Sequence, residues 1–153
     1  MPQSEFVYVT FIRTTPEKLW QALTEPEFTK QFWFGVAQEC EWKPGAAWRI
    51  VFPDGRVADT GEVVEIEPGR RLVLRWRHEL QAELCAEGYS RMTYEIEQKA
   101  GFVQLTLTHL METSESKFIK AISGGWPIIL ASLKSLLETG EALEGTGQPP
   151  KAR

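Results

Sequence analysis

One segment near the C-terminus indicates the fold most clearly. It spans residues 123–137 and reads Ser-Gly-Gly-Trp-Pro-Ile-Ile-Leu-Ala-Ser-Leu-Lys-Ser-Leu-Leu. From residue 126 onward its apolar side chains recur every three or four positions, which predicts an amphipathic helix of several turns. Gly140 is a typical signal for the end of such a helix. An amphipathic helix has an apolar stripe that must be buried against another layer of structure, so the rest of the chain has to supply a partner surface.

A run of strands before this helix supplies that surface. Segments rich in β-branched and aromatic residues are separated by turns of Gly, Pro and Asp, and several alternate between apolar and polar positions, as at Leu72, Leu74 and Trp76. Gly61 is interpreted as a β-bulge. The predicted strands span residues 6–13, 39–42, 47–52, 57–67, 71–77, 90–99 and 102–110. Because tight turns join most of them, we expect an antiparallel sheet with one apolar face.

Two short helices are predicted after the first strand. Thr15 is a good N-cap and Pro16 suits the first helical position. Pro26 ends this helix, and residues 27–32 are expected to form a second one that Gly35 closes. The predicted fold class is α+β, with a curved antiparallel sheet of about six to seven strands wrapped round a long C-terminal helix.

The charge and the composition of the chain narrow its class. We expect a single domain over residues 1–143, and a disordered tail over residues 144–153, which are rich in Gly and Pro. The 17 Lys and Arg residues against 21 Asp and Glu residues give a net charge of −4. No nucleic-acid partner is expected, because phosphate backbones are bound by clustered basic residues. No apolar run approaches the roughly 20 residues of a membrane span.

The chain is poor in reactive groups and rich in flat apolar side chains. It has two His and two Cys residues, against eight Phe, six Trp and three Tyr residues. Two free thiols and the absence of a signal peptide predict a cytoplasmic location. His78, Glu79, Glu83, Cys85 and Glu87 do not have the spacing of a metal site, so they are interpreted as a solvated acidic loop. We expect no metal and no cofactor.

Four separated segments resemble one known family. The segments are residues 9–20, 42–45, 59–63 and 123–127. They resemble the bacterial stand-alone members of the heat-shock-protein-ninety ATPase activator homologue-like (AHSA-type) family. The resemblance covers residues 5–143. That family belongs to the SRPBCC superfamily, which includes START and Bet v-like domains. The resemblance implies a helix-grip fold. It also implies several functions, because the superfamily contains lipid carriers, hormone receptors, aromatase/cyclases and a co-chaperone domain.

One histidine is expected on the apolar face of the sheet. His109 is in phase with Val103, Leu105 and Leu107 near the end of the last strand. It is either a satisfied core residue or, if the sheet and helix enclose a cavity, a polar group inside that cavity together with Tyr94. In the second case we expect both side chains to hydrogen-bond the ligand.

The two glycines of the C-terminal segment also allow two interpretations. Gly124 and Gly125 either form a kink, with Pro127 starting a renewed helix, or leave space for a ligand between helix and sheet. The two interpretations are compatible.

The favoured function is the binding or sensing of a small hydrophobic, aromatic or lipid-like molecule without catalysis. The expected ligand-binding residues are Trp33, Phe34, Trp48, Ile50, Trp76, Met92, Tyr94, Leu107, His109, Gly125, Trp126 and Ile129. One alternative is a cyclase or hydratase-like enzyme with His109 and Tyr94 as acid/base groups. This alternative is disfavoured because no carboxylate is expected on the inner faces of the strands.

A protein-interaction module of the co-chaperone type is the other alternative. A chaperone partner is not expected, because the co-chaperone of the resemblance carries a further amino-terminal domain for which this chain has no room. A homodimer is compatible with the sequence.

Overall fold

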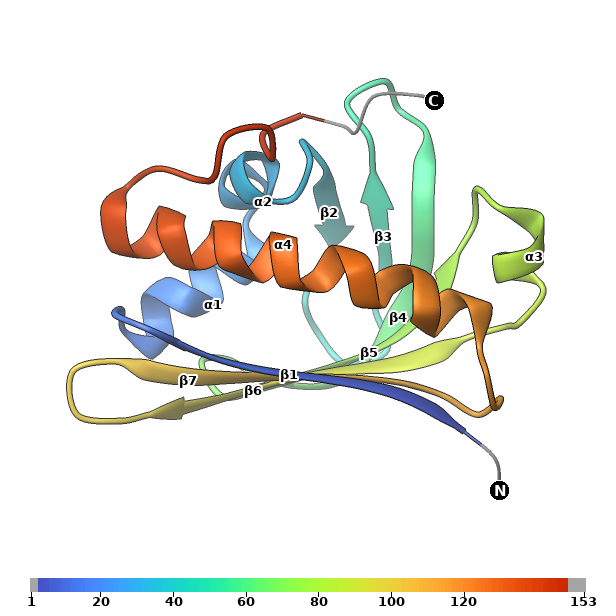
Figure 1. Cartoon of the computed structure of the whole chain (residues 1–153), viewed down its shortest axis with the longest axis horizontal. Coiled ribbons are helices and arrows are strands. Elements are labelled where there is room, and N and C mark those ends of the chain that lie inside the picture. Colours follow the sequence, from blue (N-terminus) through green and yellow to red (C-terminus); the bar gives the residue numbers. More distant parts are fainter. Residues whose placement is uncertain (1–2, 149–153) are drawn as a thin grey trace.

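The computed structural model describes residues 3–148 (Figure 1). The elements follow in the order β1 (Ser4–Ile12), α1 (Pro16–Thr24), α2 (Pro26–Phe32), β2 (Ala37–Cys40), β3 (Ala47–Val51), β4 (Val57–Glu67), β5 (Arg71–His78), α3 (Ala82–Cys85), β6 (Ser90–Gln98), β7 (Val103–Met111) and α4 (Lys117–Thr139). The strands form one seven-stranded antiparallel sheet in the order β1-β7-β6-β5-β4-β3-β2. The predicted α+β fold class is therefore confirmed.

The sheet curves round α4, and α1 and α2 lie on the same side of the sheet as α4 (Figure 1). The alternation expected from the sequence is clear in β7, where every second side chain from Val103 to Met111 is buried. On α4, the side chains of Trp126, Leu130 and Leu133 are almost completely buried. The core therefore fills the space between the concave face of the sheet and one face of α4, as the amphipathic pattern predicts.

The junction after β1 folds as its sequence predicts. The Thr15 hydroxyl accepts a hydrogen bond from the backbone nitrogen of Lys18 at 3.2 Å, and Pro16 is the first residue of α1. This cap satisfies one of the free backbone donors at the start of the helix. Pro26 then begins α2 directly, so the two short helices follow one another with Glu25 between them.

The helix α4 begins earlier than the sequence pattern suggests. Its N-cap is Ser116, whose hydroxyl accepts a hydrogen bond from the backbone nitrogen of Ile119 at 3.1 Å. The Glu87 carboxylate accepts a second one from the backbone nitrogen of Lys117 at 2.8 Å. Pro127 therefore lies inside a continuous helix instead of starting a renewed one. Glu87 caps α4, which corrects its interpretation as part of a solvated loop.

Gly61 does not form a bulge, and this expectation was wrong. β4 shifts register between Val63 and Glu65 against β5 and between Val57 and Asp59 against β3, and Gly61 is paired in both ladders. A Cβ atom on Gly61 would overlap the backbone carbonyl oxygen of Arg75 in β5. Glycine is required here because the backbones of the two strands approach closely.

The last described residues pack against the domain. Thr146 is buried, and its hydroxyl lies 2.7 Å from the Ser132 hydroxyl on α4. This contact falls within the segment 144–153 for which a disordered tail is predicted, and residues 149–153 lie outside the described residues. Across residues 3–148, no helix is both long enough and apolar enough to cross a membrane.

Candidate ligand cavity

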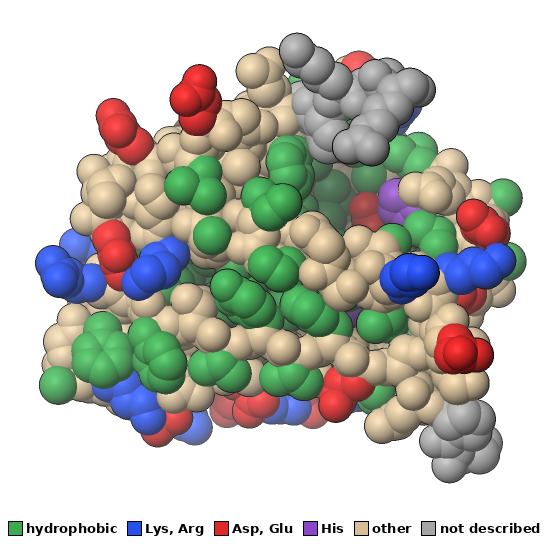
Figure 2. All heavy atoms as spheres, viewed as in Figure 1, with side chains coloured by type: hydrophobic (Ala, Val, Ile, Leu, Met, Phe, Trp, Pro, Cys, Tyr) green, Lys and Arg blue, Asp and Glu red, His purple; other side chains and the backbone are tan. Residues whose placement is uncertain are grey.

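A cavity of about 240 Å³ lies between α4 and the half of the sheet that contains β3, β4 and β5. Figure 2 shows the surface hollowed on this side of α4, with histidine and acidic side chains visible at the hollow. We call this space the α4 cavity. Seven of the predicted ligand-binding residues line it, namely Trp33, Phe34, Ile50, Trp76, Gly125, Trp126 and Ile129.

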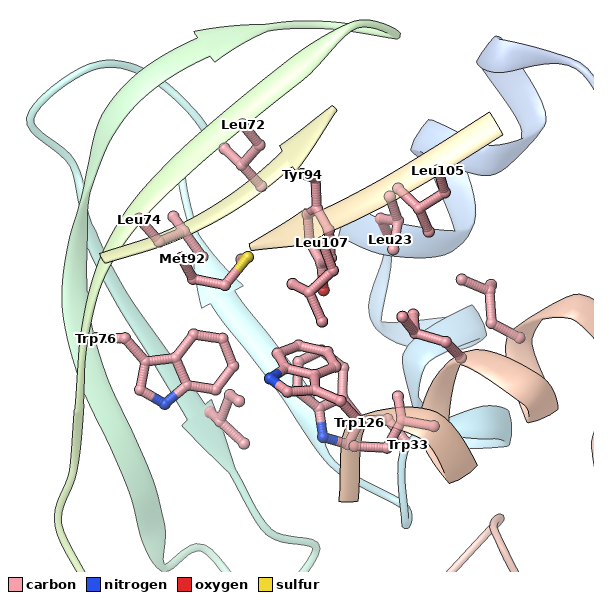
Figure 3. Close-up of a cluster of buried hydrophobic side chains, with 14 of the residues drawn as sticks. Leu23, Trp33, Leu72, Leu74, Trp76, Met92, Tyr94, Leu105, Leu107 and Trp126 are labelled. Atoms are coloured by element: carbon pink, nitrogen blue, oxygen red, sulfur yellow. The ribbon is translucent and has the colours of Figure 1, made fainter. Parts of the chain in front are cut away.

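The other predicted ligand-binding residues lie in the core and do not line the α4 cavity. They come from β3, β6 and β7 and are Trp48, Met92, Tyr94, Leu107 and His109. Figure 3 shows Met92, Tyr94 and Leu107 among other apolar side chains of the sheet, beside the indole rings. Burial raises the pKa of the Tyr94 hydroxyl above its ordinary value, so Tyr94 stays neutral. These residues support the cavity wall from behind.

Three tryptophans from different elements make a continuous aromatic wall. Trp33 follows α2, Trp76 lies on β5 and Trp126 lies on α4 (Figure 3). The ring centroids of Trp33 and Trp76 are 5.9 Å apart, those of Trp33 and Trp126 are 5.2 Å apart, and those of Trp76 and Trp126 are 5.6 Å apart. Contacts at these separations add roughly 0.5–1.5 kcal/mol per pair to the burial of the rings. The rings are inclined to one another by 26°, 54° and 69° in these three pairs, so they form an angled aromatic wall that packing holds in place.

Two of the three indoles in the aromatic wall donate to a specific side-chain acceptor. Trp76 Nε1 donates to Asp59 Oδ2 at 2.6 Å, and Trp126 Nε1 donates to His109 Nδ1 at 3.2 Å. Behind them, Trp48 Nε1 donates to the Gln38 side chain at 2.9 Å. Because a buried donor without a partner costs about 1–3 kcal/mol, these acceptors hold the rings in one orientation.

Both ring nitrogens of His109 are occupied within the core. An indole nitrogen only donates, so Nδ1 must accept from Trp126 and Nε2 must carry the proton. Nε2 lies 2.7 Å from the Ser90 hydroxyl, which donates in turn to the carbonyl oxygen of Trp76 at 3.0 Å. Burial lowers the pKa of His109 to about 3. His109 is thus a neutral residue that joins three elements of the core.

The polar end of the α4 cavity is formed by Asp59 on β4 and His78 at the end of β5. His78 Nδ1 lies 3.3 Å from Asp59 Oδ2, the same oxygen that accepts from Trp76. His78 Nε2 is buried and has no hydrogen-bond partner among the described residues. Both side chains are mostly buried, with 18% of His78 and 12% of Asp59 exposed.

Sequence reasoning missed this pair, although its signal was present. His78 continues the alternation of Leu72, Leu74 and Trp76, so extending the predicted strand by one residue would have placed it on the apolar face. It lies in β5 instead of in a solvated loop, which corrects the earlier interpretation. Asp59 is a buried carboxylate in the cavity wall, although none was expected on the inner strand faces.

Gly125 leaves open space on the cavity side of α4. A Cβ atom built on Gly125 would meet no atom within 4 Å, and the same holds for Gly124. Gly125 lines the α4 cavity, whereas Gly124 is exposed and does not. The two neighbouring glycines therefore have equal freedom to accept a side chain, and only one of them faces the cavity.

The fold and the cavity together define a class, the helix-grip proteins, in which a curved antiparallel sheet encloses a long C-terminal helix. The chain belongs to the family named "Activator of Hsp90 ATPase homolog 1-like protein", whose profile matches residues 13–138. This confirms the resemblance found in the sequence. No curated protein matches the sequence.

Solved structures of bacterial proteins share the fold. The solution structure of the Aha1 dimer from Colwellia psychrerythraea has a TM-score of 0.73 and 19% identity, covering 91% of this chain and 99% of that one. A crystal structure from Mesorhizobium loti has a TM-score of 0.74 and 22% identity, covering 88% and 96%. CalU16 from Micromonospora echinospora has a TM-score of 0.67 and 17% identity, covering 82% and 71%. At these identities the likeness shows the fold alone.

Proposed function

We propose that this protein binds a small, flat, largely apolar molecule in the α4 cavity without transforming it. The observation that carries the proposal is the aromatic wall of Trp33, Trp76 and Trp126 facing open space at Gly125. A space of this kind, with few polar groups at one end, is the usual form of a small-molecule site. The fold often serves ligand binding, which supports the same function.

The size of the cavity favours one or two rings over a long lipid chain. An apolar cavity of about 150 Å³ holds benzene in another protein. The α4 cavity, at about 240 Å³, has room for a fused two-ring molecule. Stacking on the indole rings would favour an aromatic ligand over an aliphatic one of the same volume.

The hydrogen bonds of His109 favour binding over the acid/base chemistry considered from the sequence. Both of its ring nitrogens are used within the core, and its pKa of about 3 keeps it neutral near pH 7. A general acid or base needs to be within hydrogen-bond reach of the ligand, and His109 does not line the cavity. We therefore assign His109 and Tyr94 to support of the wall.

Leucine at the two glycines gives a matched test of the site. Gly125→Leu fills the α4 cavity, whereas Gly124→Leu adds the same side chain to the exposed face of the helix. With 2-fluoronaphthalene as the probe, we expect saturable binding by the wild type and by Gly124→Leu, and at least tenfold weaker binding by Gly125→Leu in calorimetric titration. Equal affinity of all three proteins would place the probe elsewhere and refute the proposal.

We also propose that the chain forms a homodimer through the outer face of β1. Val7, Val9 and Phe11 lie on an edge strand and are 51%, 46% and 48% exposed, which forms an apolar row on the face away from α4. The similar Colwellia protein is a dimer, which supports a second copy as the partner. Sedimentation should show a dimer for the wild type and a monomer for Val9→Lys. A wild type that stays monomeric at high concentration would refute it.

A further inference from the structure

We propose that Asp59, positioned by His78, recognises a hydroxyl group on a neutral aromatic ligand. The inference rests on the proposed function, because it assigns a role to the polar end of the α4 cavity. Both hydrogen bonds that the structure gives to Asp59 use one oxygen, Oδ2, which accepts from Trp76 and faces His78. The other oxygen, Oδ1, is left to accept from a ligand.

The neighbouring groups make this end of the cavity a hydrogen-bond acceptor. Trp76 holds Asp59 Oδ2 from the aromatic wall at 2.6 Å. When His78 Nδ1 carries its proton toward Asp59, as the 3.3 Å separation favours, it holds the carboxylate in place and leaves Oδ1 as the acceptor at this end of the cavity. A ligand that enters here is therefore selected for its ability to donate.

The charge of the lining residues selects against anions. Asp59 is the only acidic residue among those that line the cavity, and no Lys or Arg lines it within residues 3–148. A carboxylate-bearing ligand would place like charges together where little water screens them. The remaining polar side chain of the lining, Gln81, is uncharged and exposed. The cavity therefore suits a neutral phenol or naphthol better than an aromatic acid.

Three probes of nearly equal shape test this selection on the wild-type protein. They are 2-naphthol, which donates a hydrogen bond, 2-fluoronaphthalene, which does not, and 2-naphthoate, which is an anion. We expect 2-naphthol to bind roughly tenfold more tightly than 2-fluoronaphthalene in calorimetric titration, as one hydrogen bond to a charged acceptor implies. We expect 2-naphthoate to bind most weakly.

The variant Asp59→Asn tests whether Asp59 Oδ1 is the atom that accepts the hydrogen bond from the ligand hydroxyl. The Trp76 indole only donates, so the amide oxygen of the variant must face it. The amide nitrogen then takes the place of Oδ1 and cannot accept a hydrogen bond. We expect the variant to lose the tenfold preference for 2-naphthol and to keep its affinity for 2-fluoronaphthalene. The control is Glu62→Gln, which neutralises an exposed carboxylate on the same strand and should leave the preference unchanged.

The positioning role of His78 has its own readout. Nitrogen-15 spectra of the imidazole in the wild type should show the proton on Nδ1, and addition of 2-naphthol should shift the ring resonances. In Asp59→Asn the amide oxygen that replaces Oδ2 still faces Nδ1, so the same tautomer should persist with a weaker hydrogen bond. A ring with its proton on Nε2 in the wild type would contradict the acceptor arrangement.

The outcomes separate this inference from the proposed function. If 2-naphthol and 2-fluoronaphthalene bind the wild type equally well, or if Asp59→Asn keeps the preference, hydroxyl recognition is refuted and apolar binding stands. If 2-naphthoate binds most tightly, the charge argument is refuted. If none of the three probes binds, the proposed function fails, and the inference fails with it. The wild-type comparison decides the matter even if Asp59→Asn does not fold.

Discussion

His109 shows how a titratable side chain can be held neutral by its neighbours. Trp126 donates to one ring nitrogen and the Ser90 hydroxyl is paired with the other, so the imidazole links α4 to β6 and β7. Placing a charge at this position would require a buried cation without a counter-charge, which is strongly unfavourable. The low pKa of His109, about 3, follows from this burial.

The depressed pKa makes stability depend on pH in a defined window. Below pH 6.5 the unfolded chain protonates His109, while the folded chain does not until about pH 3. The free energy of unfolding should therefore fall as the pH is lowered from 6.5 toward 5, with a slope approaching about 1.4 kcal/mol per pH unit. Urea unfolding at several pH values measures this slope. His109→Gln should lack this contribution, and equal slopes for the two proteins would contradict the account.

Asp59 and His78 illustrate what the sequence reveals about individual residues and what it does not. The phase of a strand identifies which side chains face inward, and it correctly placed His109 and Trp76 on the apolar face. The end of a strand is harder to predict, because a polar residue there is equally compatible with a turn. The Asp59–His78 contact joins residues of two different strands, so it depends on register, which a single sequence does not contain.

At the scale of the elements, the close approach of β4 and β5 depends on Gly61. A methyl group at this position would meet the Arg75 carbonyl oxygen, and the backbone of one strand would have to shift. We expect Gly61→Ala to lower the free energy of unfolding by about 1–3 kcal/mol, which thermal denaturation would register as a drop of several degrees. Gly101→Ala is the matched control, because a Cβ there meets nothing within 4 Å. Similar melting temperatures for both variants would contradict the close-approach explanation.

The two neighbouring glycines of α4, Gly124 and Gly125, lower the stability of this helix. Glycine inside a helix costs about 1 kcal/mol relative to alanine, and α4 contains two neighbouring glycines. A Cβ at either position meets open space, so Gly124→Ala and Gly125→Ala should each raise the free energy of unfolding by about 1 kcal/mol in chemical denaturation. Destabilisation by either substitution would show that these glycines are needed for the helix itself. Stabilisation would show that neither glycine is needed for the helix itself.

The boundaries of α4 explain why the sequence placed its start too late. The apolar periodicity is clearest after Trp126, while the first two turns are fixed by caps from outside the helix. Glu87 provides one of them from the loop before β6, and three hydrogen bonds from Ser116, Lys117 and Phe118 reach its carboxylate. Burial alone would raise the pKa of Glu87, but these bonds outweigh it and lower the pKa. Such a long-range cap is not visible in local sequence.

At the scale of the whole molecule, the fold was predictable because its signals are redundant. The alternation of the strands, the caps of α1 and the periodicity of α4 all indicate one sheet around one helix. The family resemblance agreed with them. The cavity was less predictable, because whether aromatic side chains fill a space or line it depends on their rotamers. Seven expected residues line the α4 cavity, while the other five support it from the core.

The most direct test of the central claim is a crystal structure of the wild-type protein grown with 2-naphthol. The account predicts density for a two-ring molecule against Trp76 and Trp126, beside Gly125, with its oxygen within hydrogen-bond distance of Asp59. An α4 cavity that is closed by the protein's own side chains, or a naphthol bound elsewhere on the surface, would contradict it.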